Sequence, residues 1–164
     1  RGGNEVISWL NLEVNMTSSV ALKKVIFFVP LLTVMQVNAA LPTCESEIKD
    51  VNTFLSLQGT ARINDVDDLA KILRSLTQTG RLPPRYITSD EAKRQGWSGN
   101  ETETLWGIKP TNNKWIGGDN YVSSKLPSAQ SWFSADIDVS KGYRGTKRLI
   151  YTLSGPQRYI TTDR

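Results

Sequence analysis

The pattern of hydrophobic residues changes once along this chain, and that change limits the folds it can form. Between residues 65 and 77, hydrophobic side chains recur every three or four positions, the spacing of one face of an α-helix. The residues on this face are Val66, Leu69, Ile72, Leu73 and Leu76. After Trp97 the chain contains short strand-like segments separated by turns with glycine. This order predicts an α+β domain, with N-terminal helices packed on an antiparallel β-sheet.

The ends of the expected elements follow from capping and turn residues. The helix over 65–77 can be capped by Asn64 or Asp65 and stopped by Gly80. A shorter helix is expected over 88–95, because Thr88 and Glu91 have the spacing of a capping box. Strands are expected over 132–138, 148–153 and 158–162, with a loop over 98–113. Two adjacent glycines at positions 117 and 118 favour a bulge or tight bend.

Large aromatic side chains supply most of the expected core, because residues of this size dominate the core of a small domain. The residues we expect to be buried are Trp97, Trp106, Trp115, Trp132, Leu149 and Tyr151.

The first part of the chain is typical of a leader. Residues 16–39 have a Lys-Lys pair, an apolar run and small residues at their end, which predicts a secretory signal peptide. A membrane anchor is the alternative, but the apolar run is shorter than a span of about 20 residues. Lipidation of Cys44 is a weaker alternative. We expect residues 1–15 to be translated upstream sequence, 40–62 an irregular lead-in with a short turn of helix, and 63–164 the domain.

Composition excludes several kinds of site. The 164 residues contain no histidine and one cysteine, Cys44. A zinc site built from Cys and His ligands, an internal disulfide and imidazole catalysis are therefore excluded within this sequence. We expect no cofactor and no metal. The net charge of +4 permits a nucleic acid as partner but does not require one.

Several short segments in the second half of the chain resemble one known family. They occur in the family's order and at nearly its spacing. The segments are Leu82-Pro83, Tyr86-Ile87-Thr88, Glu91-Ala92, Gly96-Trp97, Ile116-Gly117-Gly118-Asp119, Lys125-Leu126-Pro127, Trp132, Ala135-Asp136-Ile137, Gly142, Arg144, Arg148, Tyr151, Tyr159 and Thr161-Thr162-Asp163. Together they resemble the barnase-type microbial ribonucleases, which are extracellular and prefer guanyl sites. The resemblance implies the barnase-like fold and a catalytic chemistry.

The family cleaves RNA by transesterification. A glutamate takes the proton of the ribose 2′-hydroxyl, the oxygen attacks phosphorus, and a histidine protonates the departing 5′-oxygen. Two proton transfers need two groups that titrate in a useful range, and the charged transition state needs fixed cations. The resemblance implies that Arg144 and Arg148 bind the phosphate. An ion-pair network of these arginines with Asp136 is the structural alternative.

Other matched positions carry residues that differ from those of the family. The general-base position is Ser134 and the general-acid position is Arg164, after which the family continues with one more short aromatic segment. The lysine at the start of the second helix is replaced by Ser89. The guanine-recognition loop between Tyr121 and Lys125 contains Ser123, is shorter than in the family and has no arginine.

These residues leave more than one function open. One is a secreted endoribonuclease that acts on single-stranded RNA and forms a 2′,3′-cyclic phosphate. Another is a non-catalytic RNA-binding or inhibitor-binding module with the same fold. A third is a secreted toxin domain with an immunity protein. The expected partners are RNA and an acidic protein inhibitor. We expect an extracellular monomer with no membrane contact after removal of the leader.

Overall fold

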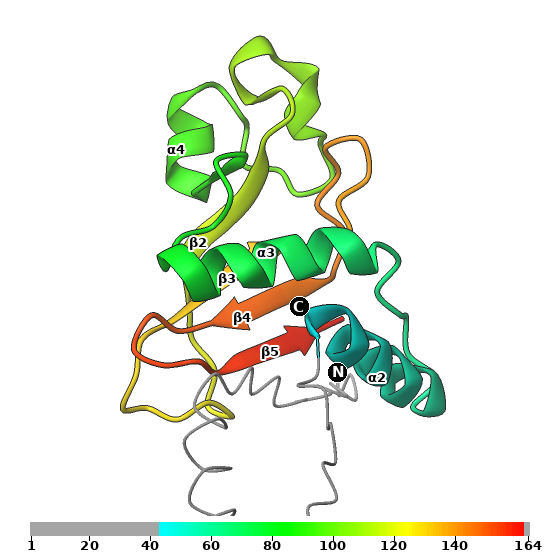
Figure 1. Cartoon of the computed structure of the whole chain (residues 1–164). Coiled ribbons are helices and arrows are strands. Elements are labelled where there is room, and N and C mark those ends of the chain that lie inside the picture. Colours follow the sequence, from blue (N-terminus) through cyan, green and yellow to red (C-terminus); the bar gives the residue numbers. More distant parts are fainter. Residues whose placement is uncertain (1–42, 163–164) are drawn as a thin grey trace, which may run out of the picture.

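The structure, a computed structural model, describes residues 43–162, in which all the helices and the two-residue strand β1 precede the other four strands. The helices are α2 (Cys44–Leu57), α3 (Val66–Thr79) and α4 (Ser89–Arg94), with 3-10 turns η1 (Leu105–Gly107) and η2 (Lys109–Thr111). The strands are β1 (Tyr86–Ile87), β2 (Trp115–Tyr121), β3 (Trp132–Asp136), β4 (Arg148–Tyr151) and β5 (Arg158–Thr161). Figure 1 shows α3 crossing in front of the strands. This arrangement confirms the α+β expectation.

Helix α2 corrects the expectation of an irregular lead-in. Its 14 residues begin after Thr43, whose side chain accepts a hydrogen bond from the Ser46 N–H at 3.1 Å. Three hydrophobic residues at helical spacing, Ile48, Val51 and Leu55, are buried. Their burial stabilises a helix whose remaining surface is mostly polar, with Phe54 and Leu57 exposed, so packing and not local propensity decides its structure. No helix in the described part of the chain is long and apolar enough to cross a membrane.

The caps of α3 and α4 follow the sequence closely. The Asp65 side chain accepts from the Asp68 N–H at 2.9 Å, and Gly80 ends α3 in the left-handed conformation at φ 68°. Thr88 caps α4 by accepting from the Glu91 N–H at 3.2 Å. The Glu91 carboxylate pairs with Arg94. Thr88 is therefore confirmed as the capping residue, whereas the Glu91 side chain accepts hydrogen bonds from Arg94 and Gln95, further along the chain.

The five strands form one sheet in the order β1-β2-β3-β4-β5. Strands β2 to β5 pair antiparallel, as expected, and β1 adds a two-residue parallel pair with β2. The sheet is therefore mixed at one edge. Strands β3, β4 and β5 end one or two residues earlier than the sequence pattern predicts.

A bulge in β2 divides that strand into two registers. Gly117 pairs with Ala135, but the next pair joins Asp119 to Ser134, so Gly118 is the extra residue. Gly118 has φ 91°, a conformation that favours glycine. Gly117 has a different reason to be small, because a Cβ there would lie 2.5 Å from Cδ1 of Tyr86. The structural interpretation of the two glycines is confirmed.

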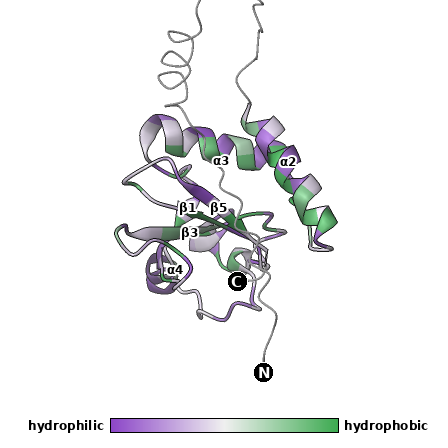
Figure 2. Cartoon of the chain, turned by 90° about the horizontal axis from the view of Figure 1, so that it is seen from below, coloured by the Kyte–Doolittle hydropathy of each residue, from purple (hydrophilic) through white to green (hydrophobic). Residues whose placement is uncertain are grey.

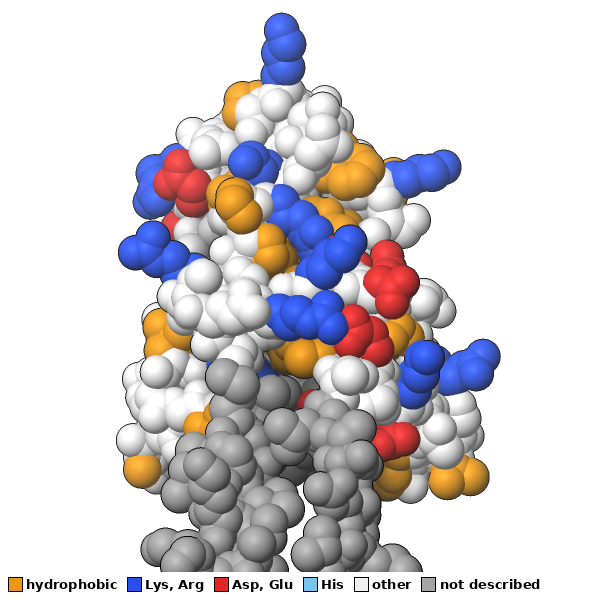
Figure 3. Space-filling view, in the orientation of Figure 1, with side chains coloured by type: hydrophobic (Ala, Val, Ile, Leu, Met, Phe, Trp, Pro, Cys, Tyr) orange, Lys and Arg blue, Asp and Glu red, His pale blue; other side chains and the backbone are white. Residues whose placement is uncertain are grey.

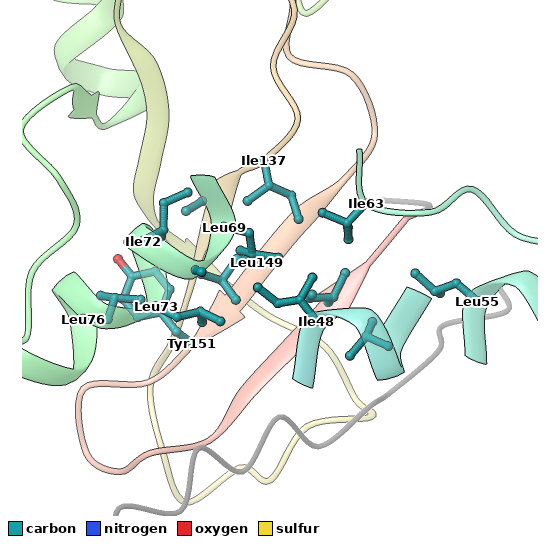
Figure 4. Packing of buried hydrophobic residues seen from close by; sticks show 14 residues of the cluster. Ile48, Leu55, Ile63, Leu69, Ile72, Leu73, Leu76, Ile137, Leu149 and Tyr151 are labelled. Carbon is teal, nitrogen blue, oxygen red and sulfur yellow. The ribbon is translucent and has the colours of Figure 1, made fainter. Parts of the chain in front are cut away.

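One face of the sheet packs against α2 and α3, and the hydrophobic core lies between them. Figure 4 shows Leu69 and Leu73 of α3 directed at Leu149 and Tyr151 of β4. Figure 2 shows α2 and α3 together on this side, with α4 on the other side of the strands. The opposite face of β3 to β5 carries neither of these two helices, and we call it the open face. Part of it is covered by loop residues, because Trp132 and Ile150 are buried there with Leu126 in a second, smaller cluster.

The expected aromatic core is only partly correct. Trp97, Trp132 and Tyr151 are at most 6% exposed, and Leu149 is fully buried. The other two tryptophans are half-buried. Trp115 packs edge-on against Tyr86, with the Arg85 guanidinium 4.1 Å above its ring, and Trp106 donates its indole N–H to the Lys114 carbonyl. The rings of Trp115 and Trp106 therefore make contacts with a guanidinium and a backbone carbonyl instead of lying in the core.

Strands β4 and β5 each begin with a buried arginine that closes the preceding turn. Nη1 of Arg148 donates to the carbonyls of Gly145 and Lys147 at 3.1 and 2.9 Å. Nη1 of Arg158 donates to the carbonyls of Thr152, Gly155 and Gln157 at 2.9–3.1 Å. Both turns are thus fixed by a side chain that belongs to the following strand.

Candidate active site

The open face brings together most of the positions that the resemblance singled out. Side chains on this face alternate along each strand with those of the core, because successive residues point to opposite sides of a sheet. Ser134 and Asp136 lie on it in β3, Asp119 is the partner of Ser134 in β2, and Arg148 is the partner of Asp136 in β4. Helix α4 contributes Ser89 through its bond to Asp119.

A buried carboxylate binds both arginines of the site. Nε and Nη2 of Arg144 donate to the two carboxylate oxygens of Asp136 at 2.7 and 3.0 Å. Nε of Arg148 lies 3.0 Å from Oδ1 of the same carboxylate. Arg144 also donates from Nη1 to Glu101 at 3.1 Å. The ion-pair network that the sequence left as an alternative is therefore present.

Burial dominates the electrostatics of this network. Asp136 is 1% exposed, and this burial raises its pKa, while the hydrogen bonds from Arg144 and the charge of Arg148 oppose the rise. Burial also lowers the pKa of Arg148, and Asp136 opposes that change. With Glu101, two positive charges face two negative charges. The network is therefore close to neutral, and any anion bound there meets hydrogen-bond donors but little net charge.

Both arginines have N–H groups that no described residue accepts from. A guanidinium carries five N–H groups, and the described contacts of Arg144 use three of them. Nη2 of Arg148 has no acceptor among the described residues. Forked donors of this kind suit phosphate oxygens. Phosphate binding by Arg144 and Arg148 remains a prediction.

Asp119 is the second carboxylate of the open face. Its Oδ1 accepts from the Ser89 N–H at 2.9 Å, and its Oδ2 accepts from the Ser89 hydroxyl. In the described part of the chain, no lysine or arginine pairs with Asp119. Directly opposed residues of antiparallel strands have Cβ atoms about 5 Å apart, so Asp119 lies beside the position where the resemblance expects the general base.

The remaining predicted positions lie further along the chain. Tyr121 is the partner of Trp132 and packs at the edge of the small cluster of Leu126, Trp132 and Ile150. Ser123 lies in the turn after β2, where its hydroxyl accepts from the Lys125 N–H at 3.2 Å. Arg164 lies outside the described residues. Substrate contacts of Ser89, Tyr121 and Ser123 remain predictions.

Sequence reasoning gave no individual role to Asp119, which it placed only within a segment that resembles the family's substrate-binding region, and it did not assign Glu101 to the site. Asp119 stands within a matched segment, and the adjacent glycines give the only signal that a bulge turns it toward Ser134. Glu101 is separated from Arg144 by 43 positions, and nothing in the sequence connects them. Within the described residues no group of three or more His, Cys, Asp or Glu side chains could hold a metal ion.

Comparison with known proteins identifies similar sequences. The chain is 34% identical over 129 residues to a ribonuclease from Bacillus pumilus, covering 74% of each protein. It is 34% identical over 128 residues to a ribonuclease from Bacillus intermedius, covering 74% of this chain and 73% of that protein. It is 38% identical over 110 residues to a ribonuclease from Heyndrickxia coagulans, covering 63% of this chain and 92% of that protein. No protein-family model matches the chain.

Proposed function

Because the chain belongs to the barnase-type family of bacterial ribonucleases, we propose that it cleaves single-stranded RNA by transesterification. The product is a 2′,3′-cyclic phosphate. The observation that carries this proposal is the open face, where the Arg144–Asp136–Arg148 network lies beside the opposed pair of Ser134 and Asp119. A phosphate on this face meets forked N–H donors on one side and a carboxylate with a hydroxyl on the other.

The proposed enzyme is slow. A general acid is typically worth about 10²–10⁴-fold in rate, and the matched position carries Arg164, whose guanidinium does not release a proton at neutral pH. The near-neutral network also limits how strongly the face attracts RNA. Weak binding and slow turnover are therefore expected together.

A non-catalytic RNA-binding or inhibitor-binding module is the second candidate. Ser134 favours it, because a hydroxyl at the general-base position cannot accept a proton at neutral pH as a carboxylate does. The two candidates differ in one observation, which is RNA binding without any cyclic phosphate among the products.

The test is a paired assay on a short single-stranded oligoribonucleotide that contains one GpN step. Mass spectrometry of the products identifies the cyclic phosphate, and fluorescence anisotropy at low salt measures binding of a 2′-O-methyl analogue that cannot react. Binding should weaken as salt rises, because counterions are released from the phosphates. Binding without cleavage would support the non-catalytic module, and a lack of both would refute both candidates.

A matched pair of variants locates the binding face. Arg148→Lys keeps the charge but removes the forked donors, so binding of the analogue should weaken. Figure 3 shows that basic side chains also occur on the face that carries α3, where Lys71 is exposed. Lys71→Ala is therefore the control, and binding should be retained. The opposite result would place the RNA on the helix-covered face.

We also propose that the protein is exported with removal of residues 16–39, which lie outside the described residues. The support is the Lys-Lys pair, the apolar run and the small residues before position 40. N-terminal sequencing of exported protein tests this. A mature chain that begins at Met16 would contradict it.

A further inference from the structure

We propose that Asp119 is the general base of this protein, taking the place of the carboxylate that position 134 lacks. The inference rests on the proposed function. The Asp119 carboxylate accepts the proton of the ribose 2′-hydroxyl, and the freed oxygen attacks phosphorus. The bond from phosphorus to the 5′-oxygen breaks, and that oxygen takes a proton from a solvent water molecule. The hydroxide that remains takes the proton held by Asp119, which restores the carboxylate. Solvent water is the only co-reactant, and it is regenerated.

The bulge in β2 is the first support. Gly117 pairs with Ala135, which belongs to the core face of the sheet. Continued without a bulge, this register would set Asp119 opposite Phe133, on the side of α2 and α3. The extra residue, Gly118, shifts the register by one, and Asp119 faces Ser134 on the open face instead. The bulge thus places the Asp119 carboxylate beside Ser134, the position where the family has its general base.

The second support is that the other carboxylates of the site are occupied. Asp136 is 1% exposed and accepts contacts from two guanidinium groups, and Glu101 pairs with Arg144. Asp119 is half-buried, and its described partners are the backbone N–H and the hydroxyl of Ser89. A carboxylate offers about four lone-pair sites, so two hydrogen bonds orient it and leave acceptor capacity for a substrate proton.

The test measures the contribution of the general base alone, by using a substrate whose leaving group needs no general acid. The substrate is guanosine 3′-(4-nitrophenyl phosphate), because nitrophenolate leaves without needing a proton. Asp119→Asn keeps the size of the side chain but removes the base. Release of nitrophenolate should fall by about 10²–10⁴-fold, the usual contribution of a general base. Binding of the 2′-O-methyl analogue should stay unchanged, because the phosphate donors are intact.

Asp90→Asn is the matched control. Asp90 is exposed and follows Ser89 in the same helix, so this variant changes the charge equally without touching the open face, and its rate should match the parent chain. Thermal melting checks that each variant folds. If Asp119→Asn does not fold, Asp119→Ser keeps a smaller acceptor for Ser89 and should show the same loss of cleavage.

Three results would overturn the assignment. The first is a parent chain that releases no nitrophenolate, which would also refute the proposed function. The second is an active parent with equally active Asp119→Asn and Asp119→Ser variants, which would leave the proposed function standing. The third is loss of activity in Ser134→Ala with retention in Asp119→Asn, which would assign the base to position 134.

Discussion

Replacing Asp136 by asparagine tests how far the fold depends on the network at the site. Asparagine has the same shape, but it removes the negative charge and turns an N–H₂ group toward guanidinium donors. Arg144 keeps its contact with Glu101 at 3.1 Å. Arg148 keeps only carbonyl acceptors, at 2.9–3.4 Å. The variant therefore leaves one buried cation without a countercharge.

The expected loss of stability in Asp136→Asn follows from the burial of the network. The side chains of Asp136, Arg144 and Arg148 are 1%, 9% and 6% exposed, so water replaces little of the lost interaction. Removing one partner of a buried ion pair costs about 3–5 kcal/mol. For a domain of this size, each kcal/mol lowers the melting temperature by about 4 °C. We therefore expect Asp136→Asn to melt about 12–20 °C below the parent.

Urea unfolding followed by tryptophan fluorescence measures the free energy of unfolding of both chains. Glu101→Gln is the control, because Glu101 is 37% exposed and exposed ion pairs contribute less than about 1 kcal/mol. If Asp136→Asn loses no more stability than Glu101→Gln, the network does not stabilise the fold, and the arginines are held by other contacts.

Three further perturbations address the packing of the domain. Gly142→Ala should destabilise by about 1–3 kcal/mol more than Gly145→Ala. Both glycines have positive φ, but only at position 142 would a Cβ clash, 2.5 Å from Oγ1 of Thr104; urea unfolding compares the two variants. Leu73→Ala should cost about 2–5 kcal/mol because Leu73 is fully buried, and Leu57→Ala little because Leu57 is 81% exposed. Burial raises the pKa of Tyr151 to about 12. The buried neutral phenol should therefore contribute fully to stability below about pH 10, and this contribution should be lost as pH rises through about 12. Tyrosinate absorbance, with Tyr151→Phe as reference, follows the ionisation of this side chain.

Local patterns predicted the parts of the fold that local physics decides. Helix α3 has hydrophobic residues at every turn, an aspartate cap and a terminal glycine, and all three signals agree with the structure. Helix α2 was missed because only Ile48, Val51 and Leu55 form its buried face, while the apolar residues Phe54 and Leu57 lie exposed among polar ones. Its stability comes from contact with α3, which no local window contains.

The site was predictable only where the family resemblance supplied positions. Arg144, Arg148 and Asp136 were expected near one another, and they are. The pair of Asp119 and Ser134 depends on a bulge that shifts the register by one residue. The hydrophobic pattern does not show where the bulge lies, so it does not show which residue of β3 is opposite Asp119. The contact of Glu101 with Arg144 joins a loop to the strand region across 43 positions, so only the folded chain shows it.

The buried arginines that open β4 and β5 affect how the neighbouring loops can be engineered. In each case Nη1 of the arginine donates hydrogen bonds to carbonyl oxygens of the loop before the strand. A grafted loop must therefore keep backbone carbonyls within hydrogen-bond distance of Nη1 of the arginine, whereas the side chains of these loop residues can vary. Lysine at position 158 would offer a compact charge without the planar reach of the guanidinium. The arginines thus act as fixed anchor points for the hairpins, and inserted residues are best accommodated at the loop tips, away from them.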